Sequence, residues 1–462
     1  MKNQYKKHIN IAIIIAIILA LTAAFVPSNF KDKAPKKPDI VQYIGASKEI
    51  KDFKESDDTR ILWTNSIFCG MPSYVISNLA PSDLLVKLRF PSTPHVWSQI
   101  FLYVFCAFIM LLSFKVRPWL ALIGAIGIGF ATENLTIIAV GHNTKAAAIG
   151  YLPLVIAGCQ YLFRKKYLLG LTVLAAGMGV QILVSHLQIT YYAGFMIAFF
   201  FLFKLIACFI PDPDNPQNEK SKLKDFAFAA SLAILGAGIA LGANSLNLML
   251  MQEYANDSIR GESALTITKQ GESNEDVKNG LTKDYVFSYS MGWSDYAATI
   301  IPNYSGGDSD KLGLYYGQIG STSGPKYIGI TIFILFVLGL VIVKGPLKWW
   351  ILTTIGITII LSMGGNNFVG VNTWMYEHFP LYNKFRSPSM MIVLIQVSVG
   401  LMAVLAVEKL LSNPKEINQK NLMIAGGSGV LLVILLSFTG TMFNDFRSTP
   451  KYDDTGKMVY DS

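Results

Sequence analysis

Long apolar runs separated by polar segments repeat along this chain of 462 residues. The first run, 9–26, has about 18 apolar residues, enough to cross a bilayer as a helix. Similar runs follow almost to the end of the chain. They predict an all-α membrane protein with about eleven transmembrane helices, at 9–26, 97–114, 119–140, 146–163, 167–184, 191–210, 226–243, 327–343, 347–363, 389–408 and 422–440.

The basic residues of the connecting segments predict the orientation. Lys and Arg gather at 115–117, 164–166, 220–224, 344–348 and 409–420. The alternate connections are poor in them, since 185–190 has none and 141–145 has only Lys145. Because cytoplasmic loops carry the excess of Lys and Arg, the N-terminus is expected in the cytoplasm of an inner-membrane protein. No cleavage site follows the first run, which is therefore expected to remain as an anchor.

Three long segments lie on the extracytoplasmic side in this arrangement, at 27–96, 244–326 and 364–388. They belong to one polytopic domain, 1–462, whose polar tail 446–462 looks cut short. The first segment is expected to hold two helices, Ala46–Glu55 and Ser82–Arg89. In the second helix, Leu84, Leu85 and Leu88 stand at helical spacing and could lie in the plane of the membrane interface.

Composition supports the membrane interpretation and excludes several functions. Hydrophobic residues make up 52% of the chain and charged residues 15%, against about 25% charged in soluble domains. The net charge of +9 is spread over the cytoplasmic loops, so it does not indicate nucleic acid.

The chain has no Walker loop and no HExxH, GxSxG or strand-linked GxGxxG motif, which argues against a pump driven by ATP, a protease and a nicotinamide enzyme. Acids that could bind a divalent metal are present, but no ligand cluster is visible.

Asp39 is the first candidate for chemistry. It lies about a dozen residues after the first span, behind Pro38, which biases Lys37 away from helix. A carboxylate held near the membrane surface could act as general base on an acceptor hydroxyl. The alternative is a solvated loop acid or a helix N-cap, and the same loop has seven other acids.

Polar residues at the outer ends of later spans form a second group of candidates. Glu133 and Asn134 fall inside the third span, where an acid is costly and indicates function, or else a hydrogen bond between helices. His142 could be an acid or base, and Lys145 could bind phosphate at the start of the next helix, unless 141–145 is only a polar turn. His186 and Gln188 join the fifth and sixth spans; we favour a site for His186 and an interfacial belt for the adjacent tyrosines.

Arg260 and Arg386 lie in the extracytoplasmic segments, whereas Lys and Arg usually concentrate in cytoplasmic loops. A guanidinium binds phosphate oxygens in a bidentate way, so they could bind a lipid phosphate; the alternative is ordinary headgroup contact. Aromatic rings beside amides suit a sugar, although packing within the loops is the stronger alternative. The residues of this kind are Trp63, Asn65, Tyr316 and Gln318.

Five segments together resemble the bacterial YfhO-like membrane proteins. They are Asp39-Ile40-Val41-Gln42-Tyr43, 62–72 (LWTNSIFCGMP), 141–145 (GHNTK), 186–192 (HLQITYY) and Phe385-Arg386-Ser387-Pro388-Ser389. The resemblance runs from the first span to the last. Members of that family are usually longer, with further spans, and Cys69 stands where a glycine is expected.

The resemblance implies a layout similar to GT-C glycosyltransferases, which take sugar from a polyprenyl-phosphate carrier and use an acid of the first outer loop as base. It implies that Asp39 is this acid and that other outer polar residues line the donor and acceptor site. Arg386, Lys145 or Arg260 would then neutralise the lipid phosphate. The sugar hydroxyls would meet His142, His186, Asn65 and Gln318, and the acceptor would belong to the cell envelope.

Two other functions stay open. A transporter or lipid flippase would use Glu133 in a proton or substrate pathway, but it should place its polar residues near the middle of the bilayer. A non-catalytic envelope assembly factor would also suit the long outer segments, and it predicts that Asp39 can be replaced without loss.

Overall fold

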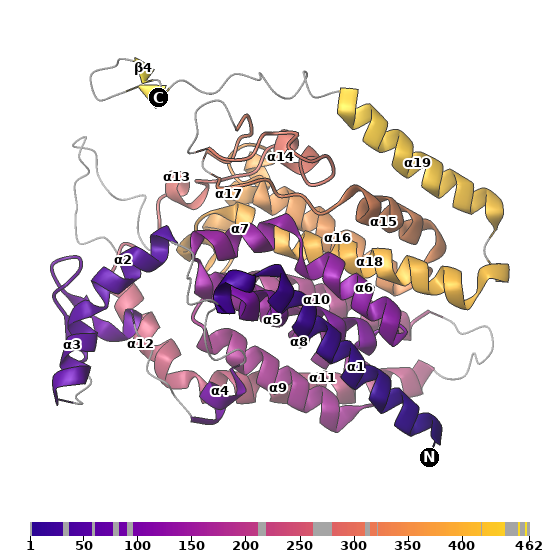
Figure 1. Ribbon diagram of the computed structural model, residues 1–462, viewed down its shortest axis with the longest axis horizontal. Helices are drawn as coiled ribbons and strands as arrows, with labels where there is room; N and C mark the ends of the chain where they lie inside the picture. The colour runs from indigo at the N-terminus through magenta and orange to yellow at the C-terminus, as the bar shows by residue number, and fades with distance from the viewer. Residues whose placement is uncertain are drawn as a thin grey trace.

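The computed structural model of the chain is built almost entirely of helices (Figure 1). It describes residues 2–30, 37–57, 61–76, 83–89, 96–210, 219–261, 280–309, 315–320, 322–416, 418–438, 451–452 and 458–459. The end of the expected last span and most of the expected tail 446–462 lie outside these residues.

The elements follow one another in this order. The helices before the second long outer segment are α1 (Lys2–Phe25), α2 (Pro38–Ala46), α3 (Lys48–Asp57), α4 (Asp83–Leu88), α5 (Val96–Ser113), α6 (Pro118–Gly129), α7 (Thr132–Val140), α8 (Asn143–Phe163), α9 (Tyr167–Leu183), α10 (Leu187–Cys208) and α11 (Glu219–Ala243). The later ones are α12 (Ser245–Asn256), α13 (Lys283–Val286), α14 (Trp293–Ala297), α15 (Ile330–Ile342), α16 (Pro346–Ser362), α17 (Val369–His378), α18 (Ile392–Ser412) and α19 (Gln419–Phe438). Two short antiparallel pairs join β1 (Trp63–Thr64) to β2 (Met71–Pro72) and β3 (Lys451–Tyr452) to β4 (Met458–Val459).

Every expected span falls on a helix or, for 119–140, on the pair α6 and α7. Among the described residues, six helices are long and apolar enough to cross a membrane, or seven if the bent pair is one span. The other four expected spans fall on shorter apolar helices, at Ile9–Phe25, Tyr167–Leu183, Ile330–Ile342 and Pro346–Ser362. The helices therefore support a multi-pass membrane protein, and the number eleven stays a prediction.

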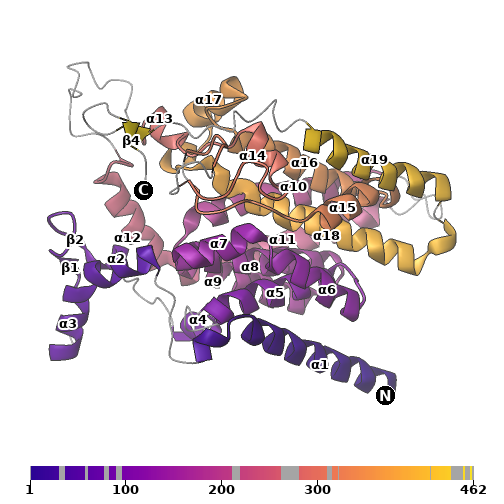
Figure 2. The ribbon, with the colours of Figure 1, turned by 45° about the horizontal axis from the view of Figure 1, so that its top comes forward.

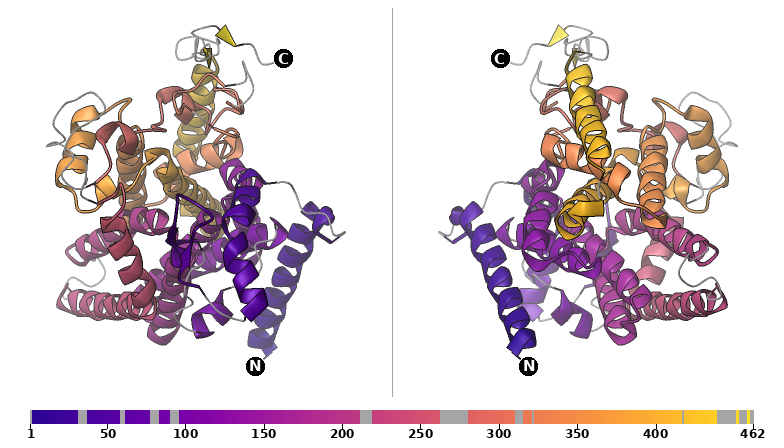
Figure 3. Two further views of the ribbon diagram at one scale, coloured as in Figure 1. Left: turned by 90° about the vertical axis from the view of Figure 1, so that its left-hand side faces the viewer. Right: turned by 90° about the vertical axis from the view of Figure 1, so that its right-hand side faces the viewer.

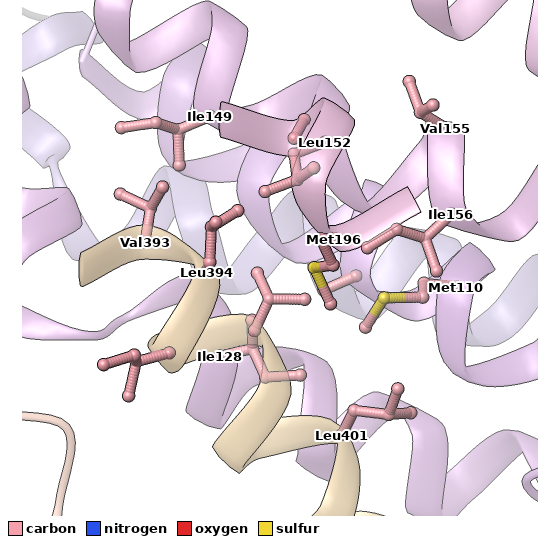
Figure 4. Packing of buried hydrophobic residues seen from close by; sticks show 14 of the residues in the cluster. Met110, Ile128, Ile149, Leu152, Val155, Ile156, Met196, Val393, Leu394 and Leu401 are labelled. Carbon is pink, nitrogen blue, oxygen red and sulfur yellow. The ribbon is translucent and has the colours of Figure 1, made fainter. Parts of the chain in front are cut away.

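The core forms where α8 packs on α5 and α9, and where α18 packs on α15, α16 and α6. Figure 4 shows Ile149 and Leu152 of α8 beside Met196 of α10 and Leu394 of α18, all of them buried. Helices α1 and α19 lie at opposite sides of this bundle (Figure 3). Only 11% of the apolar window of α19 is buried, so most of this helix is left for lipid to cover.

The first outer segment contains one helix more than predicted. Helix α3 begins at Lys48, not at Ala46, and a further helix, α2, precedes it. Pro38 explains α2: its fixed φ suits the first helical position, and Lys37 before it is extended, at φ −109° and ψ 119°. Figure 2 shows α2, α3 and the β1–β2 pair extending beyond the bundle, on the same side as α12. Asp39 therefore lies in the first turn of a helix.

Helix α4 also corrects an expectation. Its leucines do not share one side, because Leu85 is buried among Leu102 and Val180 while Leu84 and Leu88 are exposed. The short helix thus inserts a single leucine between α5 and α9. Its exposed leucines remain suited to a membrane interface.

The third expected span is bent by 52° between α6 and α7. The side-chain amide of Asn134 donates to the backbone carbonyls of Ile128 and Gly129 at the end of α6 (3.1 and 3.3 Å). At the start of α7, the N–H of Thr132 donates to the carbonyl of Tyr327 (3.1 Å). These bonds satisfy backbone groups that the break in the helix leaves without partners.

Candidate functional site

The structure brings together two candidates that lie about a hundred residues apart in sequence. His142 Nε2 lies 2.6 Å from Asp39 Oδ2. Asp39 projects from α2, and His142 precedes α8. The two side chains are 41% and 44% exposed, so the pair remains accessible to a substrate.

A tight turn positions this pair. Gly141 has φ +102°, a conformation that glycine adopts without strain, and a Cβ there would lie 2.9 Å from the Cβ of Lys37. Asn143 Oδ1 accepts hydrogen bonds from Lys37 Nζ (3.4 Å) and Gln99 Nε2 (3.1 Å). The first outer segment is thereby attached to the turn between α7 and α8, which places Asp39 beside His142.

Glu133 belongs to a second, buried ion pair. Its Oε2 lies 2.8 Å from Nζ of Lys326, and the two side chains are 5% and 10% exposed. Glu133 lies in the first turn of α7, just after the bend, and Lys326 precedes α15. Removing one partner of a buried pair typically costs about 3–5 kcal/mol, because the other charge stays buried.

Lys145 adds a second buried cation beside this ion pair. It is buried in the first turn of α8 and interacts electrostatically with both Glu133 and Lys326. Among the described residues its ammonium has no hydrogen-bond acceptor, because the carboxylate of Glu133 is bonded to Lys326. An anion such as phosphate is a partner that would suit this buried ammonium.

Burial and neighbouring charges act on both histidines. Burial, followed by the positive charge of Lys145, lowers the pKa of His142, although Asp39 and Glu133 oppose this shift. Burial, followed by the charges of Lys145 and His142, lowers the pKa of His186 to about 3. Both imidazoles are therefore mainly neutral at pH 7. A neutral His142 that bonds to the Asp39 carboxylate carries its proton on Nε2.

Several buried polar atoms near these charges have no hydrogen-bond partner within the described parts of the chain. They include Gln99 Oε1, Tyr103 Oη, His186 Nε2 and Thr190 Oγ1. Tyr103 interacts electrostatically with Glu133, and His186 with Lys145, so at least these two surround the charged cluster. A buried polar group without a partner costs about 1–3 kcal/mol, and a polar ligand would recover part of that cost.

The two outer arginines form a neighbouring cluster. Arg386 Nη1 donates to Tyr285 Oη (2.6 Å), and its guanidinium lies 5.0 Å from the centre of that ring. Arg260 donates to the carbonyl of Lys384, and burial, followed by the charge of Arg386, lowers its pKa. Gln188 links this cluster to α10, since its amide donates to the carbonyl of Arg386 and to Tyr192 Oη.

The four predicted sugar-binding residues bond to other residues of the outer segments. Trp63 Nε1 donates to Asn65 Oδ1 (3.2 Å), and the N–H of Asn65 donates to Glu49 of α3 (2.7 Å). The N–H of Gln318 donates to Asp295 (3.1 Å), and that of Tyr316 to the carbonyl of Ser305 (2.8 Å). None of these described contacts joins them to Asp39 or to Glu133.

Sequence reasoning missed Lys326 and Asp295. Burial raises the pKa of Asp295, although Tyr315 Oη, at 2.7 Å, and two backbone N–H groups donate to it. Lys326 interacts electrostatically with both Asp295 and Glu133, and so connects the second outer segment to the cluster. A lysine at the outer edge of a span, opposite to the usual bias, is the signal that could have identified Lys326.

Within the described residues, no group of three or more His, Cys, Asp or Glu side chains could hold a metal ion. The Asp39–His142 pair contributes only two such side chains.

Comparison with known proteins gives no assignment: no family model, no curated protein and no solved structure matches the chain.

Proposed function

We propose that the chain is a membrane glycosyltransferase that moves a sugar from a polyprenyl-phosphate carrier to an extracytoplasmic acceptor of the bacterial cell envelope. It would lie in the inner membrane with its N-terminus in the cytoplasm. The single observation that supports this most is the accessible Asp39–His142 pair (2.6 Å) next to the buried ammonium of Lys145. A base and an anion site side by side suit transfer from a phosphate leaving group.

The proposed step follows from this arrangement. The acceptor oxygen forms a bond to the anomeric carbon of the sugar, and the bond from that carbon to the phosphate oxygen breaks. Asp39 takes the proton of the acceptor hydroxyl, while the N–H of His142 orients its carboxylate. The lipid phosphate leaves with the bonding electron pair, and Lys145, with Lys326 beside it, stabilises the developing negative charge.

Sugar transfer by purified protein in liposomes tests this proposal. We expect the wild type to transfer sugar from at least one of a panel of polyprenyl-phosphate sugars to added acceptor. Asp39→Asn should lower the rate by roughly 10²–10⁴-fold, the usual contribution of a general base. Asp52→Asn is a matched control, because Asp52 lies in the same outer segment and pairs only with Lys48 of its own helix among the described residues.

Transfer that survives Asp39→Asn would remove Asp39 from the mechanism. If the chain is an assembly factor without catalytic activity, Asp39→Asn should also retain function in cells. The variant would then complement a deletion strain to the same extent as the wild type.

A lipid flippase is the second candidate, and the bend between α6 and α7 favours it. Broken helices whose ends face the substrate or a coupling ion are typical of transporters. The Glu133–Lys326 pair lies at this break. A flippase predicts movement of labelled lipid across liposomes that Glu133→Gln abolishes and Asp39→Asn does not. The glycosyltransferase predicts no such movement.

A further inference from the structure

The first turn of α8 carries hydrogen-bond donors that suit a phosphate. The backbone N–H groups of Thr144 and Lys145 have no acceptor among the described residues. The ammonium of Lys145 belongs to the same turn, and this residue is 8% exposed. Unpaired N–H groups at the start of a long helix attract anions, and a lysine beside them adds a full positive charge. A phosphate bound here would satisfy these donors.

Two buried side chains of α5 lie beside this turn. Gln99 Nε2 donates to Asn143 Oδ1 (3.1 Å), so Oε1 of the same amide also lies near the start of α8, and no donor reaches it within the described chain. Tyr103 follows one turn later on α5, and its Oη has no partner there either. Each of the two residues is 3% exposed. Because an amide oxygen only accepts, a phosphate without a proton cannot satisfy Gln99.

We infer that this buried turn binds a sugar 1-phosphate whose second carbon carries a hydrogen-bond donor, and that Gln99 determines this specificity. The anomeric carbon has two ring neighbours. One is the ring oxygen, which only accepts, and the other is the second carbon, whose hydroxyl or amide can donate to Gln99 Oε1. Tyr103 Oη would bond a further oxygen of the sugar. The inference rests on the proposed function and narrows its lipid-linked donor to sugars that are not 2-deoxy.

Binding of short prenyl phosphates to the full chain in detergent tests this inference without requiring transfer. The probes are citronellyl phosphate and its phosphodiesters with glucose and galactose, each hexose beside its 2-deoxy form. We expect the wild type to bind at least one hexose about tenfold more tightly than its 2-deoxy form, because the 2-deoxy form leaves Gln99 Oε1 buried without a donor. Isothermal titration calorimetry would measure the dissociation constants.

Variants assign this ratio to one side chain. Gln99→Leu should reduce it to near one, while citronellyl phosphate, which has no sugar, binds as before. If that variant does not bind citronellyl phosphate, Gln99→Met, of nearly the same length, replaces it. Gln160→Leu is the matched control and should keep the ratio. Gln160 Oε1 also has no partner within the described chain, but it lies roughly 25 Å along α8 from Asn143. Lys145→Gln should weaken every probe by roughly 10–100-fold, because all share the phosphate.

Other results would overturn the inference. A wild type that binds each hexose and its 2-deoxy form equally has no such contact. A ratio that survives in Gln99→Leu assigns the contact to another residue, and equal loss in Gln160→Leu assigns it to a general weakening of the bundle. The proposed function fails in a different way. A tenfold ratio without transfer by the same preparation would retain the sugar-phosphate site and remove the transferase, whereas equally fast transfer of the 2-deoxy sugars would do the reverse.

Discussion

The two ion pairs of the candidate site differ mainly in burial. Asp39 and His142 are 41% and 44% exposed, whereas Glu133 and Lys326 are 5% and 10% exposed. An exposed pair is screened by water and contributes little to stability, usually about 0–1 kcal/mol. A buried pair affects stability mainly when one partner is lost, because the other charge then stays buried without compensation. The first pair is thus suited to the proposed chemistry, and the second to holding the bent pair α6 and α7 in place.

The largest expected effect on stability comes from Glu133→Gln. The substitution removes the carboxylate that is bonded to Lys326 and lies near Lys145, and should destabilise the protein by about 3–5 kcal/mol. Thermal unfolding in detergent would measure it. Glu133→Gln/Lys326→Met should recover part of the loss, because it removes one of the stranded charges. A single variant as stable as the wild type would mean that the buried pair does not support the fold.

Low pH should act on the buried side of the site through His186. Its pKa is about 3 in the folded protein, against about 6.5 when unfolded. Because the unfolded state binds the proton more readily, stability is complete above about pH 6.5 and falls as the pH decreases toward 3. The loss at pH 5 should be about 2 kcal/mol.

Thermal unfolding of His186→Gln across this pH range checks the assignment, since the variant should lose most of the dependence. His378→Gln, at an exposed histidine of α17, serves as the control and should keep it. An unchanged slope in His186→Gln would assign the dependence to other groups.

The smallest effect on stability is expected at Asp39. Asp39→Asn breaks a half-exposed pair, so it should cost no more than about 1 kcal/mol while abolishing most of the activity. Unfolding and transfer rates measured on the same preparation would show both. If this variant unfolds as readily as Glu133→Gln, the contrast between the two pairs is wrong.

The sequence predicted the long helices well, because a span is a local feature: each apolar run carries its own signal. It placed the short helices α3 and α4 within about two residues of their observed bounds, but it missed α2 and the bend. Helix α2 depends on Pro38 at its first position, and the break after Gly129 is repaired by Asn134 and by Tyr327, whose contribution comes from a distant part of the chain.

The candidate site shows the same limit. Asp39, Glu133, His142, Lys145 and His186 were all identified by residue type and position. The pairing among these residues was not predictable. Asp39 of the first outer segment pairs with His142 of a later turn, and Glu133 pairs with Lys326, which was not a candidate. Trp63 and Gln318 were predicted from short runs that mix aromatics with amides. Trp63 bonds within its own segment, whereas Gln318 meets Asp295 and the side chain of Asn366 in the third outer segment.

The Glu133–Lys326 pair also has a consequence for biosynthesis. The two residues are 193 positions apart. A ribosome adds about 5–20 residues per second, so Glu133 is synthesised roughly 10–40 s before its partner. Lys145 follows within about 1–2 s and can serve as the interim counter-ion. We therefore expect the early helices to insert with Glu133 already compensated, and the later arrival of Lys326 to complete the cluster once the second half of the chain has been translated.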